Sequence, residues 1–187
     1  FVQVNVTGWC PMQALKRQNI ESSRRSNGQE IHVGISDCKV ARQPSHLVTV
    51  ALGSCVGIAL YEPVMKVGGL LHIMLPNSKQ FPGTVKPAKF ADTGIPFMLL
   101  EMRRAGARLS HLQVKIAGGA QMFSGRNNNF QLNIGERNIQ AVRAVLKQLG
   151  LNLLAEDVGG NRGRTMGLDT STGQVMIRTL GSSVRLI

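Results

Sequence analysis

The sequence predicts a single α/β domain with a mixed or antiparallel sheet. Two segments carry apolar residues at three- and four-residue steps, residues 93–105 and 135–149, and this spacing predicts helices. Between and around them lie short apolar runs bounded by Gly, Pro, Asn and Asp, which are typical of strands joined by tight turns. Helices interleaved with short strands, several of them linked as hairpins, indicate this fold class.

The chain of 187 residues is long enough for one well-buried domain with an extension. We expect residues 31–187 to form that domain. Residues 1–30 are polar and rich in Ser, Arg and Asn, which predicts a flexible N-terminal extension. The chain starts at Phe1 without the basic and then apolar order of a signal peptide, and it lacks a run of about eighteen apolar residues. We therefore expect neither export nor membrane insertion.

The three cysteines are odd in number and have no CxxC spacing, which argues against a disulfide framework and a zinc site. We expect a reducing, cytoplasmic environment and no metal or organic cofactor. Cys10 and Cys38 are interpreted as small apolar fillers or exposed bystanders. Cys55 is the thiol that needs another explanation.

The formal net charge of +12 indicates either a soluble surface kept away from zero charge or an acidic partner. The basic residues are spread along the chain, aromatic residues are scarce, and no helix-turn-helix or RNA-binding motif is present. Specific nucleic-acid binding is therefore the less favoured reading.

The elements are expected in the following order. A first strand covers residues 31–41, flanked by His32 and His46 as surface or strand-edge residues. Residues 49–76 are predicted as strand, tight turn, strand, loop and strand, and the Pro-, Gly- and Lys-rich residues 77–94 mostly as a loop near the site. Further strands are predicted over 112–120, 151–158, 164–169 and 173–180, with 123–133 as a loop.

Cap signals define the two helices. Asp92 and Thr93 are N-cap types before the first helix, and Gly106 supplies its end. Asn133 and Glu136 resemble a capping pair at the start of the second helix. Gly118 and Gly119, at the end of a strand, predict a sharp exit or a close approach of backbones.

Cys55 and His72 form a candidate nucleophile and base. If their two strands pair as a hairpin, a register of 55 with 72 or of 57 with 72 places both side chains on one face, with Cβ atoms about 5 to 8 Å apart. A slip by one residue would separate them. We expect a neighbouring imidazolium to lower the pKa of the thiol. The alternative is a buried cysteine beside a core histidine with satisfied hydrogen bonds.

Two further groups complete this candidate site. Backbone N–H groups of the turn Gly53, Ser54 and Cys55 are candidate donors to a developing oxyanion. Thr49 lies six residues before Cys55, and its hydroxyl is a candidate to orient the imidazole.

Six segments together resemble the chemoreceptor glutamine deamidase family, CheD: LGSCVGIALYEP, GGLLHIMLP, FADTGIP, GGAQMF, IGERNI and AEDVGGNRGR. They run in order from about Val33 to Ile177. The resemblance implies Cys55, His72 and Thr49 as the catalytic set and an α/β/β layered fold similar to that of certain deamidating bacterial toxins. The region before about residue 30 is not covered by it.

The resemblance implies hydrolysis of glutamine side chains on chemoreceptor cytoplasmic helices through a Cys55 thioester. It also implies a secondary glutamyl methylesterase activity and a CheC-type phosphatase as a partner. A basic groove suits the acidic helices expected of such receptors. Rival readings are a docking module without turnover, a hydrolase of another amide and a basic nucleic-acid-binding protein.

Five other polar residues are given structural roles or left open. His111 is expected at the surface at the start of a strand, and Glu136 and Asp157 are interpreted as structural. Arg162 and Arg164 are either contacts to substrate carboxylates or part of a solvated turn.

Overall fold

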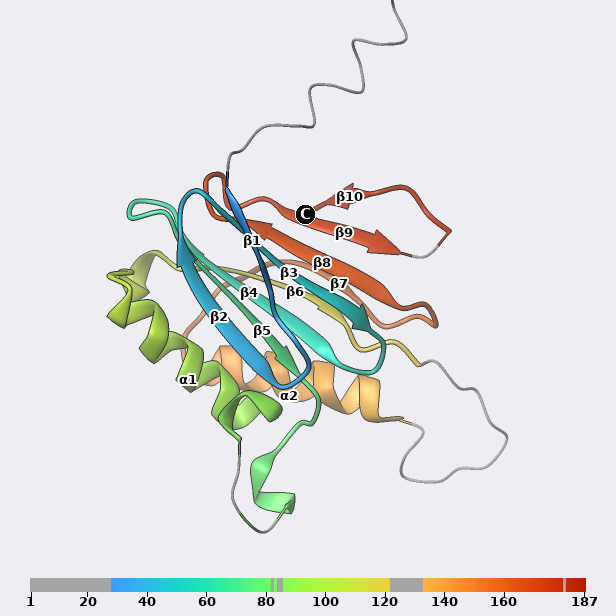
Figure 1. Ribbon diagram of the computed structural model, residues 1–187. Coiled ribbons are helices and arrows are strands. Elements are labelled where there is room, and N and C mark those ends of the chain that lie inside the picture. Colours follow the sequence, from blue (N-terminus) through green and yellow to red (C-terminus); the bar gives the residue numbers. More distant parts are fainter. Residues whose placement is uncertain (1–27, 82, 84–85, 122–132, 180) are drawn as a thin grey trace, which may run out of the picture.

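The computed structural model describes residues 28–81, 83, 86–121, 133–179 and 181–187, which form two five-stranded mixed sheets and two α-helices (Figure 1). Residues 1–27 of the predicted extension, Cys10 and nearly all of the 123–133 loop lie outside these residues. The predicted boundary at residue 30 is late by two residues, because Gln29 and Glu30 already belong to the strand Gln29–His32. Of the predicted fold class, the mixed α/β character is confirmed.

The first sheet has the order β1-β3-β8-β9-β10. Its strands are β1 (Gln29–His32), β3 (Ser45–Leu52), β8 (Arg164–Asp169), β9 (Val175–Thr179) and β10 (Arg185–Leu186). Strands β1 and β3 are parallel, and the other neighbours are antiparallel. The two-residue β10 was not among the predicted strands.

The second sheet has the order β2-β5-β4-β6-β7. Its strands are β2 (Asp37–Arg42), β5 (Val67–Ile73), β4 (Val56–Glu62), β6 (Gln113–Gly118) and β7 (Leu153–Val158). Only β6 and β7 are parallel. The predicted first strand, residues 31–41, is thus wrong as a single element: the chain turns at residues 35–36, and β1 and β2 join different sheets.

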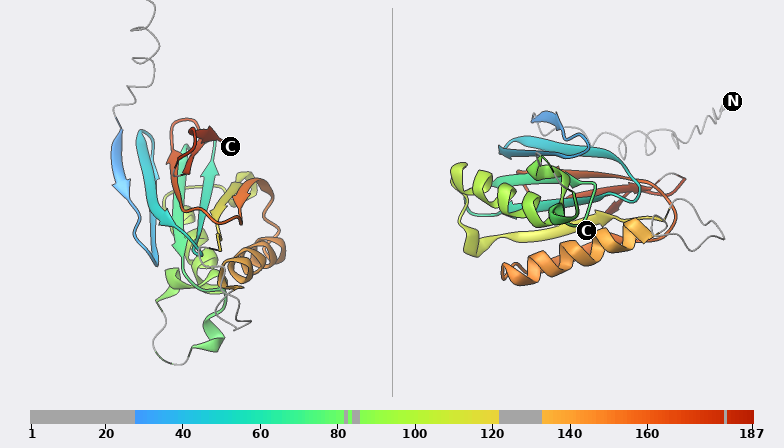
Figure 2. Two further views of the ribbon diagram at one scale, coloured as in Figure 1. Left: turned by 90° about the vertical axis from the view of Figure 1, so that its right-hand side faces the viewer. Right: turned by 90° about the horizontal axis from the view of Figure 1, so that it is seen from below.

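Both faces of the second sheet are covered. Alternate residues such as Ile58 and Leu71 pack against the helices α1 (Ala91–Arg104) and α2 (Ile134–Gln148), whereas Ala59 and Leu70 pack against the first sheet. Every residue of β4 and β5 is buried, because a central strand between two layers has no solvent face. Figure 2 shows the helices on one side of the paired sheets.

The helices begin close to their predicted positions but without the predicted caps. The N-cap residues Phe90 and Asn133 make no side-chain cap hydrogen bond. Asp92 lies inside the first turn of α1 and accepts hydrogen bonds from the backbone N–H and the hydroxyl of Ser78. Gly106 follows α1 with φ +88°, as its role as a helix stop requires.

The connection from β5 to α1 contains two 3-10 helices, η2 (Ser78–Gln80) and η3 (Pro87–Lys89). A third, η4 (Leu109–His111), precedes β6, so the prediction that His111 begins a strand is wrong. Among the described residues no helix is long and apolar enough to cross a membrane.

Candidate active site

Cys55, His72 and Thr49 come from separate segments whose side chains point between the two sheets. Gly57 on β4 pairs with His72 on β5, which is one of the two registers required by the sequence-based hypothesis. Cys55 lies two residues before Gly57 and packs on the cluster between the sheets, on the same side as His72. Thr49 belongs to β3 in the opposite sheet. The arrangement therefore depends on the stacking of both sheets.

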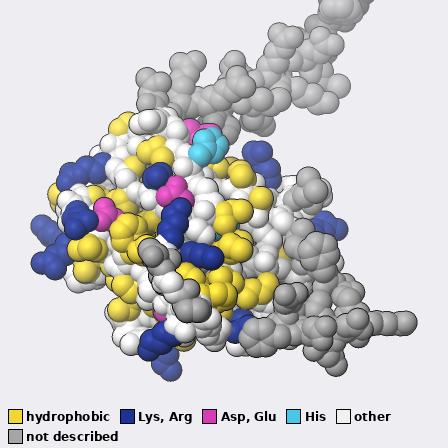
Figure 3. Space-filling view, turned by 60° about the horizontal axis from the view of Figure 1, so that its bottom comes forward, with side chains coloured by type: hydrophobic (Ala, Val, Ile, Leu, Met, Phe, Trp, Pro, Cys, Tyr) yellow, Lys and Arg dark blue, Asp and Glu magenta, His cyan; other side chains and the backbone are white. Residues whose placement is uncertain are grey.

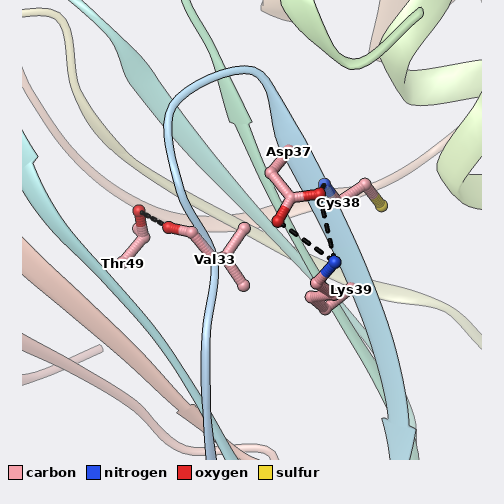
Figure 4. Close-up of polar contacts among 5 residues, drawn as sticks. All are labelled: Val33, Asp37, Cys38, Lys39 and Thr49. Atoms are coloured by element: carbon pink, nitrogen blue, oxygen red, sulfur yellow. Dashed lines mark hydrogen bonds and ion pairs between the residues drawn. The ribbon is translucent and has the colours of Figure 1, made fainter.

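Thr49 connects the imidazole of His72 to the backbone. Its Oγ1 lies 2.7 Å from His72 Nδ1. The same oxygen donates a hydrogen bond of 2.8 Å to the carbonyl of Val33, which Figure 4 shows. A hydroxyl has one proton, and here it points to Val33. We infer that Nδ1 carries the ring proton and donates a hydrogen bond to Thr49 Oγ1. The lone pair of the neutral ring is then on Nε2.

The other ring nitrogen of His72 is buried and unpaired. The side chain is fully buried, and Nε2 has no hydrogen-bond partner among the described residues. Burial lowers the pKa of His72 to about 4, so the ring is neutral at pH 7. A neutral imidazole with a free Nε2 lone pair is the form in which histidine acts as a general base.

Cys55 is partly buried, and burial raises the pKa of its thiol, while a hydrogen bond from its own backbone N–H acts in the opposite direction. The expectation that an imidazolium lowers this pKa is therefore wrong. Because the apolar residues between the sheets disfavour both charged forms, the pair rests as thiol and neutral imidazole. Among the described residues no hydrogen bond joins Cys55 to His72, and a thiol in this state becomes a nucleophile only when its proton is removed.

The segment from Thr49 to Cys55 is shaped by an irregular strand end. The register of β3 with β8 shifts between Thr49 and Leu52, and Ala51 adopts φ 58°. This left-handed conformation is unfavourable for a residue with a side chain. Gly53 N–H donates to the carbonyl of Ala51, so it is already engaged.

The three carbonyls of the turn are all bound by the second sheet and α2. Ala120 N–H donates to Gly53 O, Gly119 N–H donates to Cys55 O, and Asn138 Nδ2 donates to Ser54 O. In a planar trans peptide, the C=O of one residue and the N–H of the next point in opposite directions. The N–H groups of Ser54 and Cys55 consequently face away from these partners.

The Gly118–Gly119 pair allows the close approach that the sequence predicted. Both residues have positive φ, 111° and 66°. A Cβ on Gly118 would lie 2.3 Å from the carbonyl oxygen of Cys55, and one on Gly119 would lie 2.4 Å from Ile139. A side chain at Gly118 would push the Cys55 turn away from β6, and one at Gly119 would push against α2.

Two cavities flank this region. One of about 330 Å³ is lined by Ala51, Arg164 and Arg178 together with the small or hydroxylated residues Gly163, Thr165, Thr179, Gly181 and Ser182. The other, of about 220 Å³, is lined by Gly119, Gln121, Asn133, Glu136, Gly159 and Gly160. The first cavity carries positive charge and shares Ala51 with the strand end that leads to Cys55.

Several polar residues singled out in the sequence have structural partners. Arg164 Nε lies 2.8 Å from a carboxylate oxygen of Asp157, and Glu136 accepts a hydrogen bond from Gln140. His111, which is partly exposed, lies 3.4 Å from buried Glu62. Cys38 packs against the apolar cluster between the second sheet and the helices, as expected of an apolar filler. The described residues contain no cluster of His, Cys, Asp and Glu that would hold a metal ion.

Sequence reasoning missed Asn138 and the Val33 carbonyl. Asn138 is fully buried on α2, and a possible signal was its position four residues before the core residue Val142. No sequence signal identifies Val33, because a backbone carbonyl is common to every residue. Its role depends on how the chain passes from β1 to β2.

Comparisons with known proteins agree on one family. The family model described as "CheD chemotactic sensory transduction" matches residues 74–179, more than half of the chain, in the part that follows Thr49, Cys55 and His72. A protein from Desulforamulus reducens is 60% identical over 158 residues, which cover 84% of this chain and 95% of that protein. A protein from Clostridium novyi is 50% identical over 161 residues, covering 86% and 99%. Both are named "Probable chemoreceptor glutamine deamidase CheD".

A solved structure, the Bacillus licheniformis hypothetical protein YfiH, aligns with a TM-score of 0.38 and 17% identity over 65% of this chain and 49% of that chain. At this distance the likeness carries no argument.

Proposed function

This chain belongs to the CheD family, and from that premise we propose that it is a protein-glutamine deamidase acting on the cytoplasmic helices of chemoreceptors. Its relatives are named for that activity. The proposal assigns Cys55 as nucleophile, His72 as general base and acid, and Thr49 as the residue that orients the imidazole. The place of action is then the cytoplasm.

The proposed reaction has two halves. Cys55 Sγ attacks the side-chain carboxamide carbon of a glutamine while its proton passes to His72 Nε2. The tetrahedral intermediate collapses, His72 returns the proton to the leaving nitrogen, and ammonia departs from a thioester. Water then attacks the thioester, its proton again passes to Nε2, and the released Cys55 sulfur recovers that proton. The net change is glutamine plus water to glutamate plus ammonia, which needs no cofactor.

Backbone groups of the turn are suited to stabilise the intermediates. Within the described part of the chain, the N–H groups of Ser54 and Cys55 have no carbonyl acceptor, and the Cys55 N–H points to its own thiol sulfur. Gly53 N–H, by contrast, is bound to Ala51. We assign Ser54 and Cys55 as donors to the oxyanion. Preorganised donors of this kind typically contribute about 10²- to 10³-fold each to kcat.

The observation that carries the proposal is the state of His72. Its Nδ1 is hydrogen bonded to Thr49, its buried Nε2 has no partner in the described part of the chain, and burial keeps the ring neutral. Leaving a buried nitrogen unpaired is unfavourable by about 1–3 kcal/mol. The alternative for His72 is a core histidine with satisfied hydrogen bonds. Such a histidine would not have an unpaired, buried Nε2.

Charge supports an acidic substrate segment. The chain carries a formal +12, and Figure 3 shows Lys and Arg side chains distributed among apolar ones on one face. Arg164 is paired with Asp157, so Arg178 is the residue of this cavity that is suited to bind a carboxylate near the target glutamine. The proposal also includes two finer points that rest on family resemblance: a glutamyl methylesterase activity through the same thioester, and competition by a CheC-type phosphatase.

The test is mass spectrometry of a chemoreceptor cytoplasmic fragment incubated with the protein and with its Cys55→Ala variant. Conversion of glutamine raises the mass of a residue by about one dalton, which peptide mapping localises. We expect conversion by the parent and none by Cys55→Ala. A fragment whose candidate glutamines are changed to glutamate methyl esters, assayed in the same way, tests the esterase activity.

The rival readings predict other outcomes. A docking module would retain the fragment in a pull-down without converting it. A nucleic-acid-binding protein would bind DNA or RNA in a salt-sensitive manner that survives Cys55→Ala. Conversion that persists in Cys55→Ala would contradict the assigned nucleophile.

A further inference from the structure

We propose that Asn138 is a positioning residue that holds the Cys55 turn against the strand of His72 and sets the direction of the Cys55 N–H group. This inference rests on the proposed function for its catalytic consequence. The residue is fully buried on α2, outside the Cys55, His72 and Thr49 set.

One side-chain amide of Asn138 connects the two catalytic segments. Its Nδ2 donates to Ser54 O at 2.9 Å and to Met74 O at 3.0 Å. Ser54 immediately precedes Cys55, and Met74 comes two residues after His72. A primary amide has two N–H donors, so both are used. Because both partners are carbonyl oxygens, the orientation of the amide is fixed by chemistry.

The Ser54 contact acts directly on the next peptide group. The Ser54 carbonyl and the Cys55 N–H belong to the same planar unit and point in opposite directions. By holding the carbonyl toward α2, Asn138 holds the Cys55 N–H away from it, in the orientation assigned above to the oxyanion. Backbone N–H groups bind Gly53 O and Cys55 O. Among the donors to these three turn carbonyls, Asn138 is therefore the one that acts through its side chain.

The cost of this arrangement argues against a purely structural role. Asn138 Oδ1 is buried and has no hydrogen-bond partner among the described residues. An unpaired buried acceptor is unfavourable, and apolar residues of α2 at nearby buried positions, Ile139 and Val142, carry no such defect. The helix is already anchored beside the turn, since Gly135 packs against Gly119 O so closely that a Cβ would lie 2.5 Å away.

Asn138→Leu tests the proposal, since leucine has the same number and branching of side-chain heavy atoms as asparagine and has no donor. The matched control is Val142→Ala, which removes apolar volume one turn later on the same helix and lowers the melting temperature. We expect kcat of Asn138→Leu on the receptor fragment to fall by about 100-fold with KM changed by less than about three-fold, because a small misplacement of reacting groups acts on kcat. Val142→Ala should keep the parent kcat below its melting temperature.

Amide hydrogen exchange gives a readout that does not depend on activity. Faster exchange over residues 53–56 is expected in Asn138→Leu and not in Val142→Ala. Unchanged kcat and unchanged exchange in folded Asn138→Leu would overturn the inference, as would an equal loss of kcat in both variants. A parent without deamidase activity would contradict the proposed function, and the exchange result would then decide the positioning role alone. If Asn138→Leu does not fold, the smaller Asn138→Ser takes its place.

Discussion

The two faces of strand β5 bury side chains of different chemistry. Leu71 and Ile73 face the helices in a cluster made of aliphatic residues and methionine. His72, between them in sequence, faces the first sheet, where Thr49 is its hydrogen-bond partner. Both faces gain stability from apolar packing, and Leu70 faces the first sheet in a second apolar cluster. Only the second face of β5 also holds a polar side chain, His72, at an energetic cost. One face builds the scaffold, and the other is where the proposed chemistry lies.

Substitutions of the neighbouring residues His72 and Leu71 on β5 should differ most strongly in their effects on activity and on stability. His72→Leu removes the proposed base and the unpaired Nε2, so kcat should fall by at least about 10³-fold while the free energy of unfolding stays equal or rises. Leu71→Ala should lower the free energy of unfolding by about 2–5 kcal/mol and keep kcat in the folded protein. Denaturant titration and single-turnover assays check both. If His72→Leu were destabilised but kept its activity, the face of β5 that carries His72 would be structural rather than catalytic.

Thr49→Val should have the next largest effect. It removes the acceptor of the Nδ1 proton while keeping the shape of the side chain, and we expect kcat to fall about five-fold, in line with the loss of one hydrogen bond of about 1 kcal/mol. Thr49→Ser keeps the hydroxyl and should restore kcat to within about three-fold of the parent. Equal activity of the valine and serine variants would show that the hydroxyl does not act on the imidazole.

The pH dependence of stability should report the buried His72. Its pKa is about 4 in the folded chain and near 6.5 when unfolded, so the unfolded state binds more protons between these values. Stability should therefore be lost as pH falls from 6.5 to 4, by up to about 3 kcal/mol from this group. Urea titrations of the parent and His72→Leu isolate the effect, which should be absent in the variant. Parallel curves would contradict the lowered pKa.

The smallest effect is expected at the basic cavity. Arg178→Glu should lower kcat/KM about five-fold at low salt, and the difference should shrink at high salt as screening grows. Arg103→Glu makes the same charge change at an exposed site at the end of α1 and serves as the control. Equal losses in both variants would assign the effect to net charge rather than to the cavity.

Local sequence patterns predicted those features of the fold that depend on residues close to one another in the chain. The strand-turn-strand-loop-strand order over 49–76 follows from apolar runs and turn residues near one another in sequence. The observed Gly57–His72 register is one of the two that the sequence left open. The close approach at Gly118 was likewise readable, because only glycine tolerates it. The helices were placed to within a few residues, but neither cap formed as predicted.

What the sequence did not predict depends on stacking of distant segments. The split of residues 31–41 between two sheets brings the Val33 carbonyl to Thr49, and the first sheet then buries His72. Burial lowers the pKa of His72 and raises the pKa of Cys55. The shift of Cys55 is opposite to the direction that the sequence led us to expect. Asn138 contacts residues 64 and 84 positions away in sequence, beyond the range of helical or strand periodicity.

The most direct test of this account is the protonation state of His72, measured by long-range proton–nitrogen NMR of the labelled protein at pH 7. The account predicts a neutral ring with the proton on Nδ1 and a bare Nε2, and the same signals should persist as pH is lowered toward 5. A proton on Nε2, or an imidazolium at pH 7, would contradict it, because the lone pair that receives the thiol proton would then be missing.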